Sequence, residues 1–256
     1  MLNLLLSGAC GRMGHAISEA CRDSETRRIV AGVDSNAAAG ALGNPYPVYE
    51  KITDFEGKAD CIIDFSHHSA LPALLSYAVS HQTPLVVATT GHTEEELAQM
   101  HEASKHIPVF YSRNMSLGVN LLIELTKKAT AVLKDSFDIE IVERHHNQKL
   151  DAPSGTALMI ADAAAELFDE KPEYVYDRHS ERRVRSKNEI GIHSVRGGTI
   201  VGEHEISFCG ENEVITLSHS AYSRTVFASG ALAAASFLAG KTAGLYDMSA
   251  MIAETI

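Results

Sequence analysis

Apolar and polar positions follow two alternating patterns along the first 114 residues. Short apolar runs typical of buried strands occupy positions 2–7, 29–34, 61–65, 84–90 and 107–111. Helical spacing lies between them and is clearest at 69–80 and 93–106, where the second segment opens with Thr-Glu-Glu-Glu, a negatively charged first turn. Uninterrupted apolar strands that alternate with helices predict an α/β domain with a doubly wound parallel sheet, covered on both faces.

The pattern changes after a long helix that is expected at about 116–134. Runs at 137–143, 189–195, 199–208 and 214–219 alternate apolar and polar residues, and glycine-containing turns at 197–198 and 210–212 are typical of hairpins. They predict a second α+β domain with a mostly antiparallel open sheet that has one polar face. A final Ala- and Gly-rich helix at 226–240 is expected to return to the first domain. We therefore expect one domain from 1–114 and 225–256, and another from 115–224.

Composition narrows the class of protein. The chain of 256 residues has a formal net charge of −11, which argues against general nucleic-acid binding and against attraction to anionic membranes. No apolar run reaches the length of a membrane span. Four cysteines without a C-x-x-C pair are expected to be reduced thiols, which favours a cytoplasmic protein. A basic segment at 178–187 is either a solvated loop or a source of charge for an anion site or a subunit contact.

A glycine-rich turn follows the first strand and opens a helix. Its sequence at 8–14, Gly-Ala-Cys-Gly-Arg-Met-Gly, is followed by Asp34, which lies 20 residues beyond the last glycine at the end of the second strand. Such glycines let a pyrophosphate approach the backbone, and such an acid takes the ribose hydroxyls of a dinucleotide. Asp34 would repel a 2′-phosphate, and Ser35 offers no positive charge to hold one. Arg12 is the alternative source of a positive charge for such a phosphate. The residues favour NADH over NADPH.

Two further strands end in polar segments where a doubly wound sheet places its ligand. Thr89-Thr90-Gly91 closes the fourth strand, and 112–115, Ser-Arg-Asn-Met, closes the fifth. We expect these segments to contact the nicotinamide or the substrate. The alternative is that either one is an ordinary strand exit.

The segment 143–157, Glu-Arg-His-His-Asn-Gln-Lys-Leu-Asp-Ala-Pro-Ser-Gly-Thr-Ala, combines two histidines, a lysine and a helix start. Pro153 prevents a helix from running through the preceding residues, and Ser154 is a natural N-cap for a helix that continues to about Phe168. The first N–H groups of a helix suit a carboxylate or a phosphate, and Lys149 adds a full charge nearby. The cluster predicts chemistry on a small anion.

With these motifs, the chain closely resembles the dihydrodipicolinate reductase family of lysine biosynthesis over nearly its whole length. The resemblance rests on the glycine turn, Asp64-Phe65-Ser66, 88–91, the 143–157 signature, 201–204 and Ser223-Arg224. It implies a Rossmann domain for the cofactor, a second domain for substrate binding and oligomerisation, and a homotetramer. The implied reaction is hydride delivery from NADH or NADPH to a cyclic unsaturated imine that carries two carboxylates.

The resemblance also implies roles for individual residues. His145 and Lys149 are the catalytic pair, and the sequence leaves open which of them donates the proton. His146, Ser154, Gly155, Thr156 and Thr90 would hold the substrate. The cofactor-binding residues would be Gly8, Gly11, Arg12, Met13, Gly14, Asp34, Phe65, Ala88, Thr90, Ser112, Asn114 and Met115.

Departures from the family pattern concern the cofactor and not the reaction. Many members carry an arginine where this chain has Ser35, and some carry one where it has His67. Other readings are a zinc site built on His145, His146 and His204, an aspartate-type amino-acid dehydrogenase, and a nucleotide sensor without turnover. Adjacent histidines on an extended segment point in opposite directions and no His-Glu-x-x-His is present, so no metal is expected. Retention of both His145 and Lys149 disfavours the sensor.

Overall fold

The computed structural model describes residues 1–37 and 43–254, and the chain divides into two units. The first unit comprises Met1–Leu117 and Arg224–Ile256, and the second comprises Gly118–Ser223. The expected boundaries, at 114/115 and 224/225, lie within a few residues of these.

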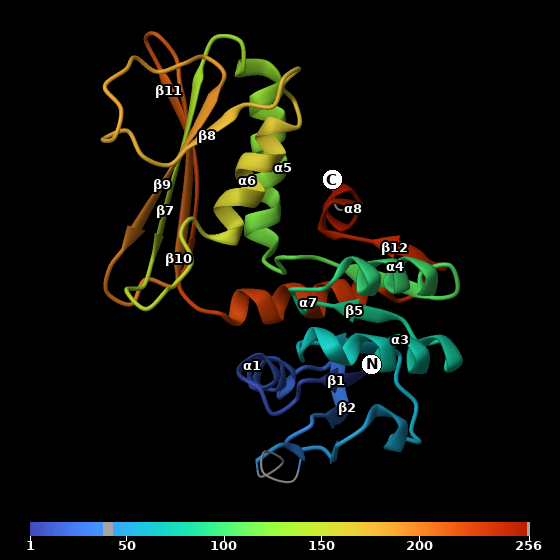
Figure 1. The fold of residues 1–256 in the computed structure, drawn as a ribbon. Helices are drawn as coiled ribbons and strands as arrows, with labels where there is room; N and C mark the ends of the chain where they lie inside the picture. The colour runs from blue at the N-terminus through green and yellow to red at the C-terminus, as the bar shows by residue number, and fades with distance from the viewer. Residues whose placement is uncertain (38–42, 255–256) are drawn as a thin grey trace. The chain divides into compact units, whose positions relative to one another are not determined.

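The first unit is built on a seven-stranded sheet (Figure 1) with the order β12-β6-β5-β4-β1-β2-β3, and all its pairings are parallel. The predicted strands are β1 (Leu2–Ser7), β2 (Arg27–Val33), β4 (Cys61–Asp64), β5 (Leu85–Val87) and β6 (Pro108–Tyr111). Two short strands that the apolar pattern did not reveal, β3 (Val48–Tyr49) and β12 (Gly244–Tyr246), extend the two edges. The doubly wound parallel sheet is confirmed.

Alternate side chains of the central strands enter two separate cores, as the pleat requires. Leu4 and Leu6 pack with residues of α1 (Arg12–Cys21), α7 (Thr225–Leu238) and α8 (Met248–Ala253). Leu5 packs on the opposite face with residues of α3 (Leu71–Ser80) and α4 (Glu94–Ala103). A capping box between Thr93 and Glu96 opens α4, as its first turn predicts. The Ala- and Gly-rich helix α7 belongs to the first unit, as expected, and its small residues pack in the core of that unit. It is not the final helix, because α8 follows it.

The second unit has a five-stranded sheet with the order β11-β10-β7-β9-β8. Its strands are β7 (Asp138–His145), β8 (Glu173–Val175), β9 (Glu189–Arg196), β10 (Gly202–Cys209) and β11 (Val214–Ala221). Helices α5 (Leu117–Leu133) and α6 (Gly155–Ala165) lie along one face of this sheet (Figure 1) and share its apolar core. The other face carries mostly polar side chains.

This second sheet is mixed, which corrects the expectation of a mostly antiparallel one. Strands β10 and β11 pair antiparallel through the turn expected at 210–212, and β10 also pairs antiparallel with β7. In contrast, β7–β9 and β8–β9 are parallel. The turn at 197–198 is therefore not a hairpin, because β7 lies between β9 and β10. Period-two alternation shows which face of a strand is buried, but it does not show the direction of the neighbouring strands. Here α6 lies between β7 and β9 in the chain, and this connection allows the two strands to run parallel.

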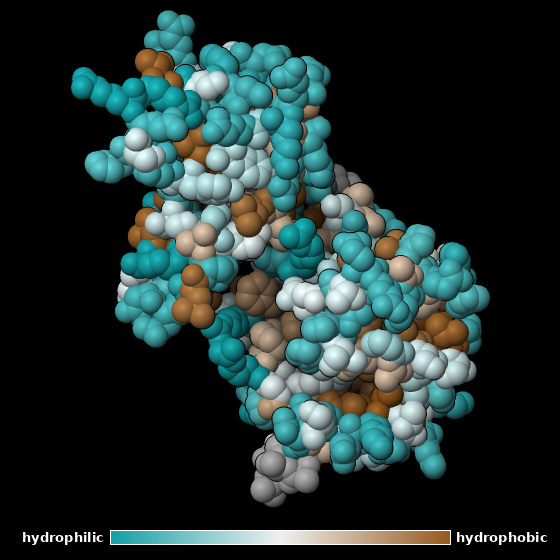
Figure 2. Space-filling model, viewed as in Figure 1, coloured by the Kyte–Doolittle hydropathy of each residue, from teal (hydrophilic) through white to brown (hydrophobic). Residues whose placement is uncertain are grey.

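The basic segment folds onto the second sheet. Arg178 donates hydrogen bonds to Glu189 and Glu140, both at 2.6 Å, and Arg185 donates to Glu140 at 3.0 Å and to Asp138 at 3.1 Å. The charges of Arg178 and Arg185 are thus held by carboxylates of the same unit. Figure 2 shows a mainly hydrophilic face on each unit, with hydrophobic residues scattered over it.

Candidate active site

The glycine turn connects β1 to α1 in the way that a close backbone approach requires. Gly8 has a φ of 80°, and a Cβ atom on Gly14 would lie 2.3 Å from the carbonyl oxygen of Gly8. Gly11 is the N-cap residue of α1. The Cys10 amide donates to the Asp34 carboxylate at 2.9 Å, so the turn is tied to the end of β2. Only glycine fits at positions 8 and 14 without displacing this backbone.

A cavity of about 400 Å³ opens beside this turn at the carboxyl ends of β1, β2 and β4. It is lined by Ser7, Gly8, Gly11, Val33, Asp34, Ser35, Glu50, Phe65, Ser66, His67, Ser69 and Ala70. The wall therefore carries two acids, Asp34 and Glu50. Its position, beside the glycine turn where the strand order reverses, is that of a dinucleotide site in doubly wound sheets.

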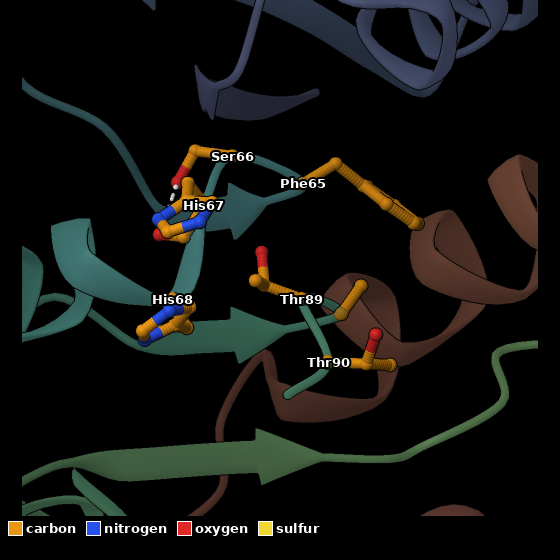
Figure 3. Close-up of a pocket in the computed structure, with 7 residues that line it drawn as sticks. Phe65, Ser66, His67, His68, Thr89 and Thr90 are labelled. Atoms are coloured by element: carbon orange, nitrogen blue, oxygen red, sulfur yellow. Dashed lines mark hydrogen bonds between the residues drawn. The ribbon is translucent and has the colours of Figure 1, made fainter. Parts of the chain in front are cut away.

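A second cavity, of about 270 Å³, lies at the carboxyl ends of β4 and β5 (Figure 3). Its lining is Phe65, Ser66, His67, His68, Ala88, Thr89 and Thr90. Phe65, Ser66 and His67 line both cavities, so the two form neighbouring parts of one region.

Histidines hold the threonine segment of this second cavity in place. His92 Nε2 donates to the Thr89 carbonyl oxygen at 3.0 Å, and His68 Nδ1 lies 2.9 Å from Glu96 Oε1. The hydrogen bond from His68 and that from the Thr93 amide hold the pKa of Glu96 below its usual value. Thr89 Oγ1 donates to the buried Asp64 carboxylate at 2.8 Å, which joins the ends of β4 and β5.

The other cofactor residues expected from the sequence lie in different surroundings. Ser112 Oγ donates to the Asn114 carbonyl oxygen at 2.7 Å, in the turn that follows β6. The Met115 side chain is buried in the core of the first unit and Met13 packs against the same core, whereas Arg12 is exposed at the start of α1. The Met115 side chain is therefore not open to a ligand, whereas that of Met13 is partly exposed.

In the second unit, β7 runs through His145 and does not end at Glu143 as the sequence suggested. Glu143 and His145 consequently point to the same, covered face of the sheet. Glu143 Oε2 lies 2.6 Å from His145 Nδ1, and the Glu143 side chain has no exposed surface. Although burial alone would raise it, the pKa of Glu143 falls to about 2 because Arg196 and His145 donate hydrogen bonds to the carboxylate.

Arg196, at the end of β9, holds the same carboxylate with two hydrogen bonds, at 2.8 and 2.7 Å. It also donates to the Asp151 carbonyl oxygen at 2.7 Å. The Ser154 amide donates to Glu143 Oε1 at 3.1 Å. Glu143 thus joins His145, β9 and the start of α6.

Ser154 is the N-cap of α6, as predicted, and its Oγ accepts from the Ala157 amide at 3.1 Å. A Cβ atom on Gly155 would have nothing within 4 Å, so α6 faces open space at its first residue. The helix ends at Ala165, earlier than the expected Phe168.

Lys149 lies in the loop between β7 and α6, where its Nζ is 2.9 Å from Asp151 Oδ1. The positive charge of Lys149 reaches His145, whose pKa is lowered first by burial and further by Lys149 and Arg196, against an opposing effect of Glu143. His146 follows directly, half-buried, and its carbonyl oxygen accepts from the Lys149 amide at 3.2 Å. Within the second unit, the structure therefore brings together His145, Lys149 and the start of α6.

Arg196 and His204 have partners that no local sequence pattern indicates. Arg196 reaches Glu143 only because β9 pairs in parallel with β7, and such a pairing cannot be read from either strand alone. His204 reaches Ser154 from β10 for the same kind of reason. The position of His67 and His68 after β4 was a usable signal, since strand ends hold ligands in this fold.

Across residues 1–37 and 43–254, no group of three or more His, Cys, Asp or Glu side chains is arranged to hold a metal ion. Among the helices in these ranges, none is both long and apolar enough to cross a membrane.

The fold and the glycine-turn cavity define a Rossmann-type oxidoreductase with a separate second unit. Family models described as "Dihydrodipicolinate reductase, N-terminus" and "Dihydrodipicolinate reductase, C-terminus" match residues 2–115 and 118–252. The chain belongs to the dihydrodipicolinate reductase family. It is an oxidoreductase of the reduction step in lysine and diaminopimelate biosynthesis.

Named relatives agree with this family. The chain is 52% identical over 252 residues to the 4-hydroxy-tetrahydrodipicolinate reductase of Caldanaerobacter subterraneus subsp. tengcongensis, covering 98% of each. It is 45% identical to that of Clostridium tetani, covering 98% of this chain and 97% of the relative. Among solved structures, a dipicolinate-bound dihydrodipicolinate reductase from Paenisporosarcina sp. TG-14 matches with a TM-score of 0.81 and 26% identity, covering 96% and 97% of the two chains.

Proposed function

We propose that this chain reduces 4-hydroxy-tetrahydrodipicolinate to tetrahydrodipicolinate, with the first unit holding the nicotinamide cofactor and the second holding the substrate. The observation that supports this proposal most strongly is that His145, Lys149 and the start of α6 lie together in a chain of this family. The cofactor, when bound, supplies the hydride. The residues of this chain bind the substrate and supply the proton.

The substrate carboxylates bind at the first turn of α6, through Gly155 and Thr156, with Ser154 holding the helix start and His146 completing the site in the second unit. A helix N-terminus is suited to a carboxylate because its first N–H groups and its dipole favour negative charge. Lys149 adds a formal positive charge. The dipicolinate in the Paenisporosarcina structure is a small dicarboxylate, which supports this class of ligand.

The geometry favours His145 over Lys149 as the proton donor. An ionised carboxylate can only accept, so the proton on His145 Nδ1 is donated to Glu143 and Nε2 is the ring atom that exchanges a proton. His145 donates from its doubly protonated form. Lys149, already paired with Asp151, then serves to orient and neutralise a substrate carboxylate.

For the cofactor, we propose NADH in preference to NADPH. Asp34 and Glu50 line the same cavity, and both would repel a 2′-phosphate. Asp34 is held in place by the amides of Cys10 and Asn36, each at 2.9 Å, with its oxygens still able to accept from ribose hydroxyls. Phe65, Ala88 and Thr90 would line the nicotinamide end.

We further propose a cytoplasmic homotetramer whose subunits meet at the second unit. Support comes from the family and from the polar face of the mixed sheet, which neither α5 nor α6 covers. Sedimentation equilibrium would report the mass directly, and a monomer at working concentration would contradict this proposal.

The reaction is tested by following nicotinamide absorbance while the preceding synthase generates substrate from pyruvate and aspartate semialdehyde. Oxidation of NADH that requires both the synthase and this chain is expected. Folded protein that binds NADH and yet oxidises none would contradict the proposed reaction.

A further inference from the structure

We propose that Glu143, clamped by Arg196, is a positioning residue that fixes His145 in the tautomer with the proton on Nδ1. This inference rests on the proposed function, because the role of His145 is itself a proposal. Glu143 and Arg196 thereby receive a role in positioning, although we place neither of them in contact with the substrate.

The first argument is the isolation of the carboxylate. Glu143 has no exposed side-chain surface, and water cannot replace its partners. Each oxygen is occupied by protein donors: Oε2 by His145 and Arg196, and Oε1 by Arg196 and the Ser154 amide. A buried carboxylate with this set of donors has one stable orientation.

The second argument is the hydrogen-bond chemistry of the pair. The Glu143 carboxylate stays ionised over the working pH range, since its pKa is held at about 2. An ionised carboxylate has no proton to donate, so it selects the Nδ1–H tautomer of a neutral His145. The Nε2 atom is left to exchange protons, as in enzymes whose buried acid orients a histidine.

The third argument is the space kept around Nε2. Gly202, on β10, faces the ring, and a Cβ atom at this position would lie 3.1 Å from His145 Nε2. The Glu143 hydrogen bond restrains one edge of the ring while the lack of a side chain at Gly202 leaves room beside the other. The Glu143 clamp therefore sets both the orientation and the proton position of the imidazole.

The charged and titratable groups beside His145 come from β7, β9, β10 and the loop after β7. Glu143 favours the imidazolium form of His145, whereas Lys149 and Arg196 oppose it. His204 lies on the neighbouring strand β10, and its ring centre is 5.2 Å from that of His145. Without the Glu143 charge, only burial and the charges of Lys149 and Arg196 remain, and all of these disfavour the imidazolium form of His145. The pKa of His145 would then fall further.

The test combines nitrogen-15 NMR of histidine-labelled protein with kinetics of Glu143→Gln. The His145 signal is assigned by its loss in His145→Ala. In the wild type, above the His145 pKa, a protonated Nδ1 and an unprotonated Nε2 are expected. Glu143→Gln should mix the tautomers, move the His145 titration to lower pH, and reduce kcat about tenfold or more with the KM for NADH unchanged.

Two further variants separate positioning from general damage. Glu170→Gln changes an exposed acid that follows α6, at the opposite end of this helix from Ser154, and it should leave tautomer and kcat at wild-type values. Glu143→Asp restores the charge on a shorter arm, so it should restore the Nδ1–H tautomer and recover part of kcat. If Glu143→Gln does not fold, Glu143→Gln combined with Arg196→Met removes the paired charges together. The expectations for the tautomer and for kcat stay the same, and the titration shift should be smaller, because Arg196 also opposes the imidazolium.

An unchanged tautomer ratio and titration in Glu143→Gln would overturn the inference, and so would an unchanged kcat beside an altered tautomer. Failure of the proposed function has a different signature. Wild-type turnover in His145→Ala would remove the catalytic role of the ring, while the NMR comparison would still report whether Glu143 holds it.

Discussion

Ser154 Oγ lies 2.9 Å from Nε2 of His204, and the same oxygen caps α6 by accepting from the Ala157 amide. The contact connects β10 to the start of the helix at which we place the substrate carboxylates. His204 is 4% exposed, and burial followed by repulsion from His145 lowers its pKa from 6.5 to about 4. The imidazole is thus neutral where the protein works.

This neutral histidine predicts a specific acid sensitivity. Between pH 6.5 and about 4 the unfolded chain binds a proton at position 204 and the folded chain does not, so stability falls as pH falls through this window. His204→Gln should remove roughly 3 kcal/mol of that pH dependence. Urea unfolding on both sides of the window measures it. The exposed His179→Gln is the control, and an equal pH dependence in wild type and His204→Gln would contradict the account.

The donor assignment predicts the shape of the pH–rate profile. If His145 donates, kcat/KM falls as pH rises through the lowered pKa of its imidazolium, because the donating form is lost. Lys149→Ala removes a positive charge that opposes that form. The falling limb of its residual activity should therefore move to higher pH. A limb that disappears in this variant would identify Lys149 as the donor, and Lys187→Ala, on an exposed loop, serves as control.

Cofactor preference should follow the charges at the ribose end of the larger cavity. Ser35→Arg places a cation beside Asp34, and Glu50→Gln removes one of the two acids that line this space. Each change should raise kcat/KM for NADPH relative to NADH, and the double variant should raise it most. Steady-state kinetics with both cofactors give the ratio. A ratio that stays constant in all three variants would show that these positions do not set the preference.

Local sequence patterns predicted the parts of the fold whose causes are local. The Thr93–Glu96 capping box, the Ser154 cap and the glycine turn each depend on residues close together in the chain. The apolar runs likewise located the long strands, and both faces of the parallel sheet are buried as expected. The sequence pattern does not reveal the edge strand β3, because its two residues are too few to show a period.

The order of the second sheet and the partners of Arg196 and His204 could not be predicted, because they depend on pairing between strands that are distant in the sequence. Neither the parallel alignment of β7 with β9 nor the insertion of β7 between β9 and β10 leaves a trace in the alternation of any one strand. Arg196 and His204 join the site only through those pairings, so their partners could not be named from the sequence. The basic segment illustrates the same limit, since its acids at 138, 140 and 189 lie beyond its own ends.

The central claim is that the segment from His145 to Lys149 performs chemistry and is not merely structural. The most direct test is the turnover of His145→Ala and Lys149→Ala with synthase-generated substrate, measured beside the NADH dissociation constant of each. We expect turnover to fall about a hundredfold or more in His145→Ala, since a positioned proton donor contributes at least that factor. Turnover should also fall strongly in Lys149→Ala, because that variant loses the charge that orients a substrate carboxylate. NADH affinity should stay at the wild-type value in both. Wild-type turnover in both variants, or an equal loss of NADH affinity that accounts for the lower rate, would contradict it.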